Sequence, residues 1–182
     1  MVNTDELSAG LQELDRLLSA QPVAARQLRL GATASEVESI AQRMGVVPPA
    51  TIRILYGWHD GTARTPGDWE LNLFPSYWHF QSLELIEQMS SFPLDWCHRA
   101  GVEGFPFAKD PTGQWLVAQS GMEDKVLQVS SDFVTGSWPD GTMLGLVQAT
   151  CQALKGQHVE FAAEFSNEKM EWVFPRQESL DD

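Results

Sequence analysis

The chain has 182 residues, 43% of them hydrophobic, so it is long and apolar enough to bury the core of one domain. Its 12 Lys and Arg stand against 25 Asp and Glu, a formal net charge of −13 at pH 7. This charge argues against direct binding to nucleic acid and favours a basic partner, although acidity that serves solubility alone is the alternative. No apolar run nears the roughly 20 residues that span a bilayer and the N-terminus lacks a signal-peptide pattern, so a cytoplasmic protein without membrane contact is expected.

An amphipathic helix is predicted over Asp5 to Ala20, ended by Pro22. Polar residues separate leucines that recur at helical spacing. The leucines of this stripe are Leu7, Leu11, Leu14, Leu17 and Leu18. A connector over 23–30 should lead to the next helix.

The next stretch, 31–61, predicts a helical hairpin. Thr33 and Glu36 form a capping box that begins the first helix, and Gly45 supplies the left-handed residue that ends it. Pro48-Pro49 forbids continuation and presets the first turn of the second helix.

The second helix of the hairpin carries Ile52, Leu55 and Tyr56 on its apolar side. We expect Gly57 to break it. Asp60-Gly61 then makes a turn.

Strands are predicted after this hairpin. Residues 69–73 alternate apolar with polar, and Ser82 can cap a short helix that ends near Phe92-Pro93. No regular structure is expected over 94–104. Strands over 105–108, 115–118 and 125–129, the first two joined by the turn Asp110–Gly113, predict an antiparallel meander.

A turn-rich stretch over 130–140 precedes a helix capped by Thr142 and ended by Gly156. Residues 157–182 fit a helix, two strands or both, and 177–182 resemble a frayed acidic tail. These elements predict a single α+β domain over 1–182, with a mostly antiparallel sheet and flanking helices.

Candidate catalytic groups are sparse. His59, Asp60, His79 and His98 could supply a general base or metal ligands, but no metal-ligand spacing accompanies them. The two cysteines, at 97 and 151, are too few for a disulfide framework and should be reduced and at least partly buried. We therefore expect no enzyme, no cofactor and no metal site, and an enzyme of small polar substrates using His59, Asp60 or His98 is the alternative.

Seven tryptophans and several acidic turns supply candidates for a partner-binding surface. Trp69 and Trp115 are expected in the core, which is also the favoured alternative for Trp58. For Asp60 and Asp110 the alternative is a side chain that fixes its own turn. The partner-binding candidates are Trp58, Asp60, Trp78, Trp96, Asp110, Glu123, Asp124 and Trp138.

The order of these motifs resembles the SUKH superfamily (SMI/KNR family). The resemblance begins with Gly-Ala-Thr, the Arg-Met-Gly stop, the double proline and Leu-Tyr-Gly-Trp-His-Asp-Gly. It continues through Ser82-Leu83-Glu84, the strand and turn 105–113 and the closing helix. It covers about 28–156, leaving helix 5–20 and an extension over 157–182 outside, and 137–141 depart from the family's Ser-Phe pattern before that helix.

This resemblance implies a SUKH-like fold and a non-enzymatic protein-interaction domain. Bacterial members look like immunity proteins that neutralise a cognate toxin, often a nuclease, and yeast-like members act as regulatory modules. A basic toxin domain is the expected partner, because opposite charges steer association. A regulatory module with a constitutive partner is the alternative.

Overall fold

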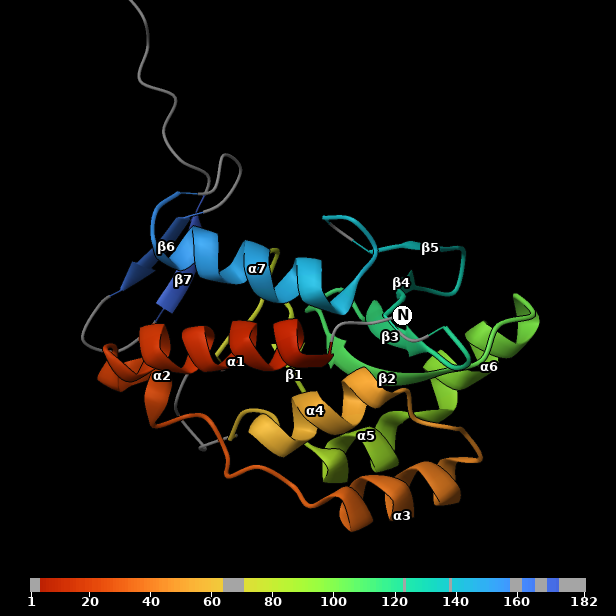
Figure 1. Cartoon of the computed structure of the whole chain (residues 1–182). Helices are drawn as coiled ribbons and strands as arrows, with labels where there is room; N and C mark the ends of the chain where they lie inside the picture. Colours follow the sequence, from red (N-terminus) through yellow and green to blue (C-terminus); the bar gives the residue numbers. More distant parts are fainter. Residues whose placement is uncertain are drawn as a thin grey trace, which may run out of the picture.

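An antiparallel five-stranded sheet lies at the centre of the structure, with helices packed around it (Figure 1). The computed structural model describes residues 4–63, 71–122, 124–137, 139–157, 162–165 and 170–173. The strands follow one another in space as in sequence and form a meander, as predicted. They are β1 His79–Phe80, β2 Gly104–Lys109, β3 Trp115–Gln119, β4 Val126–Val129 and β5 Val134–Gly136.

The two central strands are buried along nearly their whole length. In β2 every residue except Lys109 is buried, and in β3 every residue except Gln119. Pro106 lacks the N–H of a ladder bond, and the β2–β3 register shifts between Pro106 and Ala108. Burial on both faces accounts for the continuous apolar runs in the sequence.

The N-terminal helix and the closing helix lie side by side. α1 spans Thr4–Ser19 and α7 spans Met143–Leu154, so both predicted helices are confirmed. Thr142 caps α7 by accepting the Gly145 N–H at 2.9 Å. Glu13 of α1 lies 2.9 Å from the Lys155 ammonium, which ties the C-terminal end of α7 to α1.

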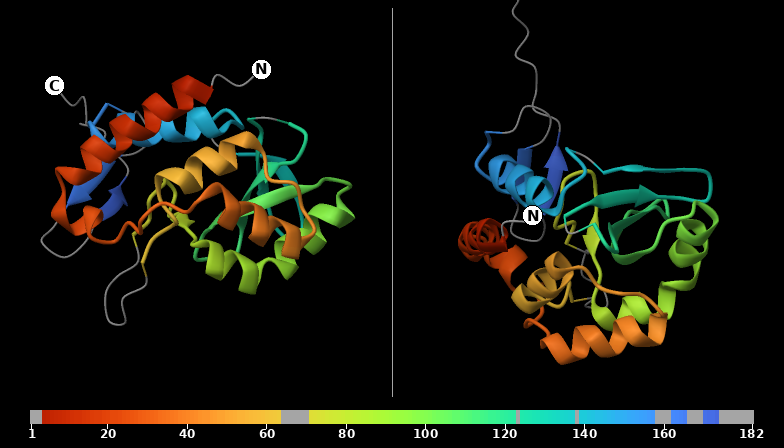
Figure 2. Two further views of the ribbon diagram at one scale, coloured as in Figure 1. Left: turned by 60° about the horizontal axis from the view of Figure 1, so that its bottom comes forward. Right: turned by 45° about the vertical axis from the view of Figure 1, so that its right-hand side comes forward.

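Three helices gather on one side of the molecule, at the bottom of Figure 1. They are α3 Ala34–Met44, α4 Ala50–Trp58 and α5 Leu83–Met89. Thr33 and Glu36 form the predicted capping box, and Gly45 ends α3 with a φ of 70°. Figure 2 shows α3 and α5 next to each other from two further directions.

Several local predictions are wrong. α4 continues through Gly57 to Trp58, and Pro49 is its extended N-cap residue rather than part of its first turn. The connector contains a short helix, α2 Pro22–Ala25, with Pro22 in its first turn. A helix also covers 94–99 of the stretch 94–104 where no regular structure was expected, since α6 spans Ser91–Arg99. Pro93 lies in its first turn, where proline removes no intrahelical bond.

The strand predictions also need correction. β1 and β5 were not expected, and the latter lies inside the stretch predicted to be turns. Residues 71–73 of the predicted strand 69–73 lie in no named strand, and the Leu71 N–H donates to the Gln27 side-chain oxygen at 2.9 Å. Beyond α7, β6 Ala162–Phe165 and β7 Met170–Val173 form an antiparallel hairpin. Trp69 and the tail 177–182 lie outside the described residues.

An aromatic cluster fills the core between the sheet and the three grouped helices. Tyr56 of α4 packs with its ring centroid 5.1 Å from Phe80 and 5.8 Å from Phe105. Phe74 joins Phe80 and Phe107 at 6.1 and 6.3 Å. The structure is thus a single α+β domain, and its described residues contain no helix long and apolar enough to cross a membrane.

Candidate functional site

A groove of about 310 Å³ opens between α3, α5 and the connector that precedes α3. Its floor is apolar, because it is formed by the side chains of Ile40 and Leu83, which are 7% and 5% exposed. Its rim is charged. The residues that line it are Leu30, Gly31, Ala32, Glu36, Ser39, Ile40, Arg43, Asp60, Leu83, Glu84 and Glu87. We call this feature the α3–α5 groove.

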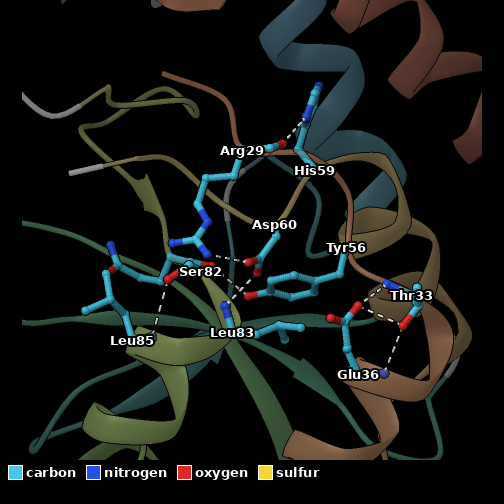
Figure 3. Close-up of polar contacts among 10 residues, drawn as sticks. Arg29, Thr33, Glu36, Tyr56, His59, Asp60, Ser82, Leu83 and Leu85 are labelled. Atoms are coloured by element: carbon cyan, nitrogen blue, oxygen red, sulfur yellow. Dashed lines mark hydrogen bonds and ion pairs between the residues drawn. The ribbon is translucent and has the colours of Figure 1, made fainter. Parts of the chain in front are cut away.

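The helical register of α3 directs one row of side chains to the groove. Glu36, Ser39, Ile40 and Arg43 recur at spacings of one helical turn. The start of this row is fixed by Thr33, whose N–H and hydroxyl both donate to Glu36 Oε2 at 2.7 Å (Figure 3). The Thr33 backbone N–H is the main cause that lowers the pKa of Glu36, so this glutamate carries a negative charge at neutral pH.

The opposite wall comes from α5. Ser82 caps this helix by accepting the Leu85 N–H at 3.4 Å, and Glu84 and Glu87 follow on neighbouring turns. Two bonds from the Arg43 guanidinium reach the two oxygens of Glu87, one of them 3.1 Å long, and they lower the pKa of Glu87. This bidentate pair joins α3 to α5 at one end of the groove.

The connector is held against the C-terminal end of α4 by backbone bonds. The Ala32 N–H donates to the Tyr56 carbonyl at 2.8 Å, and the Asp60 N–H donates to the Leu30 carbonyl at 3.2 Å. A Cβ at Gly31 would lie 2.2 Å from the Gly57 carbonyl oxygen, so only glycine allows this approach.

Asp60 lies where the three elements meet, with its side chain 14% exposed. Its Oδ1 accepts the Leu83 N–H at 2.7 Å, and its Oδ2 lies 3.2 Å from Arg29 Nη2 (Figure 3). Burial is the largest effect on its pKa and raises it, opposed by the Leu83 N–H and Arg29. The charges of Glu36 and Glu84 raise it further, so each of these two glutamates repels the Asp60 carboxylate.

The structure differs from the alternative role suggested for Asp60. The sequence suggested that its side chain fixes the turn it begins. Instead it bonds the first residue of α5, 23 positions later, and Gly61 at a φ of 71° makes the bend. A Cβ at Gly61 would lie 2.4 Å from the Ser82 nitrogen, so glycine is needed there for two reasons.

The tryptophan candidates lie in different environments. Trp78 is 6% exposed and belongs to the core. Trp58 packs against the core while partly exposed, and Trp115 is buried as predicted. Trp96 lies on α6 with its ring 6.4 Å from the ring of the exposed Phe92, away from the α3–α5 groove.

The acidic candidates outside the groove hold loops. Asp110 Oδ1 accepts the Gln114 N–H at 2.7 Å across the turn that contains Gly113, whose φ is 94°. Asp124 Oδ1 accepts the Met143 N–H at 3.1 Å at the start of α7. Glu123 and Trp138 lie outside the described residues.

The candidate catalytic residues are not brought together. His59 Nδ1 donates to the Arg29 carbonyl at 2.5 Å and its Nε2 lies 3.1 Å from Asp15, and Figure 3 shows its ring pointing away from Asp60. Both cysteines are free and buried, and burial raises the pKa of the Cys97 and Cys151 thiols to about 11. Across the described ranges, no group of three or more His, Cys, Asp or Glu could hold a metal ion.

Sequence reasoning found Asp60 and Glu36 but missed most of the groove. Arg29, Arg43, Glu84 and Glu87 look like ordinary solvent-facing charges in the sequence. The only signal was the spacing of Glu84 and Glu87, which places both on one helix face. A comparison with known protein families found no matching family, and a comparison with curated proteins found no match.

Proposed function

We propose that the chain is a non-enzymatic protein-interaction domain that binds a basic protein partner through the α3–α5 groove. The arrangement of Glu36, Asp60 and Glu84 around an apolar floor carries this proposal. Like charges held together disfavour the folded state, and a bound cation relieves that repulsion. A positively charged group bound in this groove therefore stabilises the folded chain.

The net charge of −13 supports the same partner. A domain with this charge attracts a basic protein from a distance and accelerates their encounter. A toxin that grips nucleic acid needs a basic surface, so an acidic protein can cover its cleft. Together with the resemblance of the motifs to the SUKH superfamily, this favours a toxin-neutralising immunity protein.

Co-expression tests the proposal. If a gene for a large toxin-like protein lies directly upstream, the toxic C-terminal domain of that protein is expressed with and without this chain. We expect the chain to restore growth and the purified pair to bind more weakly as salt is raised. Continued killing despite soluble chain would contradict the immunity role, and binding indifferent to salt would contradict the electrostatic part. A partner that co-purifies where no toxin gene is adjacent would instead indicate a regulatory module.

A further inference from the structure

We infer that the α3–α5 groove receives one cationic side chain of the partner, an arginine or a lysine, next to an apolar partner residue that covers Leu30. This inference rests on the proposed function, because it assigns the contact through which a basic protein would bind.

The size and floor of the groove fit a single long side chain. Its volume of about 310 Å³ lies at the lower end of the roughly 300–1,000 Å³ of small-molecule sites. The floor offers the side chains of Ile40 and Leu83. Lysine and arginine lay their aliphatic stems on such a surface while the charged head stays among polar groups.

The charges of the rim leave acceptors for that head. Arg43 is engaged by Glu87 and by Ser39, and Arg29 is engaged by Asp60. The side chain of Glu84 has no hydrogen bond or ion pair with any residue that the structure describes. In Glu36 the two bonds from Thr33 both end on Oε2, so Oε1 accepts no hydrogen bond from the described residues.

An exposed leucine stands at the edge of the same groove. Leu30 is 91% exposed, although its backbone is fixed by the bond between its carbonyl and the Asp60 N–H. A single exposed leucine needs no explanation, but one that borders an acidic groove adds an apolar contact beside a charged one. The matching partner segment therefore carries a cation next to an apolar residue.

Short capped peptides test this in the full chain. The probes are a Gly-Leu-Arg-Gly peptide, the same peptide with lysine, and the same peptide with citrulline, which keeps the shape of arginine without its charge. Titration into the ¹⁵N-labelled chain should shift the amides of Ser39, Arg43, Leu83 and Glu87 with the arginine or the lysine peptide. The citrulline peptide should bind at least fivefold more weakly.

Matched variants locate the charges responsible. Glu36→Gln keeps the capping box, because glutamine serves at that position, and Glu84→Gln removes a charge that no described residue pairs. Each should weaken peptide binding about twofold to fivefold, the range of exposed ion pairs. Glu103→Gln changes an exposed glutamate outside the groove by the same charge and should leave binding unchanged.

The outcomes separate this inference from the proposed function. Equal binding of the citrulline peptide, or a Glu36→Gln/Glu84→Gln variant that binds like Glu103→Gln, would overturn the inference. If that double variant still rescues cells from the toxin, the groove is not the contact, while the proposed immunity role stands. If the unaltered chain fails to rescue but binds the peptides as expected, the groove stands and the immunity role fails.

Discussion

The close approach of Gly61 to the start of α5 predicts a large and specific loss of stability on Gly61→Ala. The left-handed φ of 71° costs an alanine about 1 kcal/mol net, once the stiffer unfolded chain is counted. The added Cβ would also lie 2.4 Å from the Ser82 nitrogen and 2.5 Å from the Gln81 carbonyl carbon. Backbone atoms cannot rotate away, so over-packing adds about 1–3 kcal/mol.

The expected total is therefore about 2–4 kcal/mol, a large share of the roughly 5–15 kcal/mol by which domains are stable. Urea denaturation followed by circular dichroism measures it. The midpoint should fall without a change in the slope if the denatured state is unaltered.

Substitutions at three further glycines separate the cost of the left-handed φ from the cost of the close backbone contact. Gly45 has a φ of 70° and an open Cβ position, so Gly45→Ala isolates the conformational cost of about 1 kcal/mol. Gly31 has no left-handed φ but a Cβ position 2.2 Å from a carbonyl oxygen, so Gly31→Ala isolates the contact at about 1–3 kcal/mol. Gly57 has neither, and Gly57→Ala should stabilise α4 by up to about 1 kcal/mol.

The order of the free energies of unfolding of the four glycine variants tests this reasoning. Equal losses for Gly61→Ala and Gly45→Ala would refute the reasoning, because the contact with the Ser82 backbone would then contribute nothing. A Gly31→Ala variant as stable as the unaltered chain would show that the connector is not pressed against α4 as the structure has it.

Three other predictions concern single groups. Burial raises the pKa of Asp60 in the folded chain, so its contribution to stability is fully present below the unfolded pKa and is lost as pH rises through the folded one. Asp60→Asn keeps an oxygen for the Leu83 N–H, so urea titrations should find this variant at least as stable as the unaltered chain at pH 7. The difference in free energy of unfolding should shrink in acid, and a less stable variant at pH 7 would contradict the prediction. With thiol pKa values of about 11, Cys97 and Cys151 should react with a disulfide reagent near neutral pH only after denaturant is added, and rapid reaction of the folded chain would contradict their burial. Ser76 has a φ of 67°, so Ser76→Gly should raise the free energy of unfolding by up to about 1 kcal/mol, and a loss in the same denaturation assay would show that the serine is favoured there.

Local sequence signals predicted helix and strand ends correctly where the residues that decide the structure are close together in the sequence. The capping box at Thr33 and the left-handed stop at Gly45 predicted both ends of α3, and Thr142 predicted the start of α7. The apolar runs separated by the Asp110–Gly113 turn predicted β2 and β3. In each case the interaction that decides the structure lies within a few residues of the signal.

Predictions failed where a residue's position within an element decides its effect. Pro93 was taken to end α5, but it lies in the first turn of α6, where its missing N–H would have had no partner. Gly57 lies in the last turn of α4, where the helix tolerates it. β1 has two residues and β5 three, too few for the period of two to appear.

The groove shows why Asp60 attracted attention while the residues with the strongest case for recognition did not. An aspartate before a glycine marks a bend, and both oxygens of Asp60 prove to be engaged, by Leu83 and by Arg29. Glu84, by contrast, carries a negative charge that no described residue pairs, and the sequence presents it as one more glutamate on an exposed helix face. Its significance depends on packing between distant segments, because the Asp60–Leu83 bond places it near Asp60 and the contact of α5 with α3 places it beside an apolar floor. Residues that position a site carry local signals, whereas residues that face a partner acquire their role from packing between distant segments.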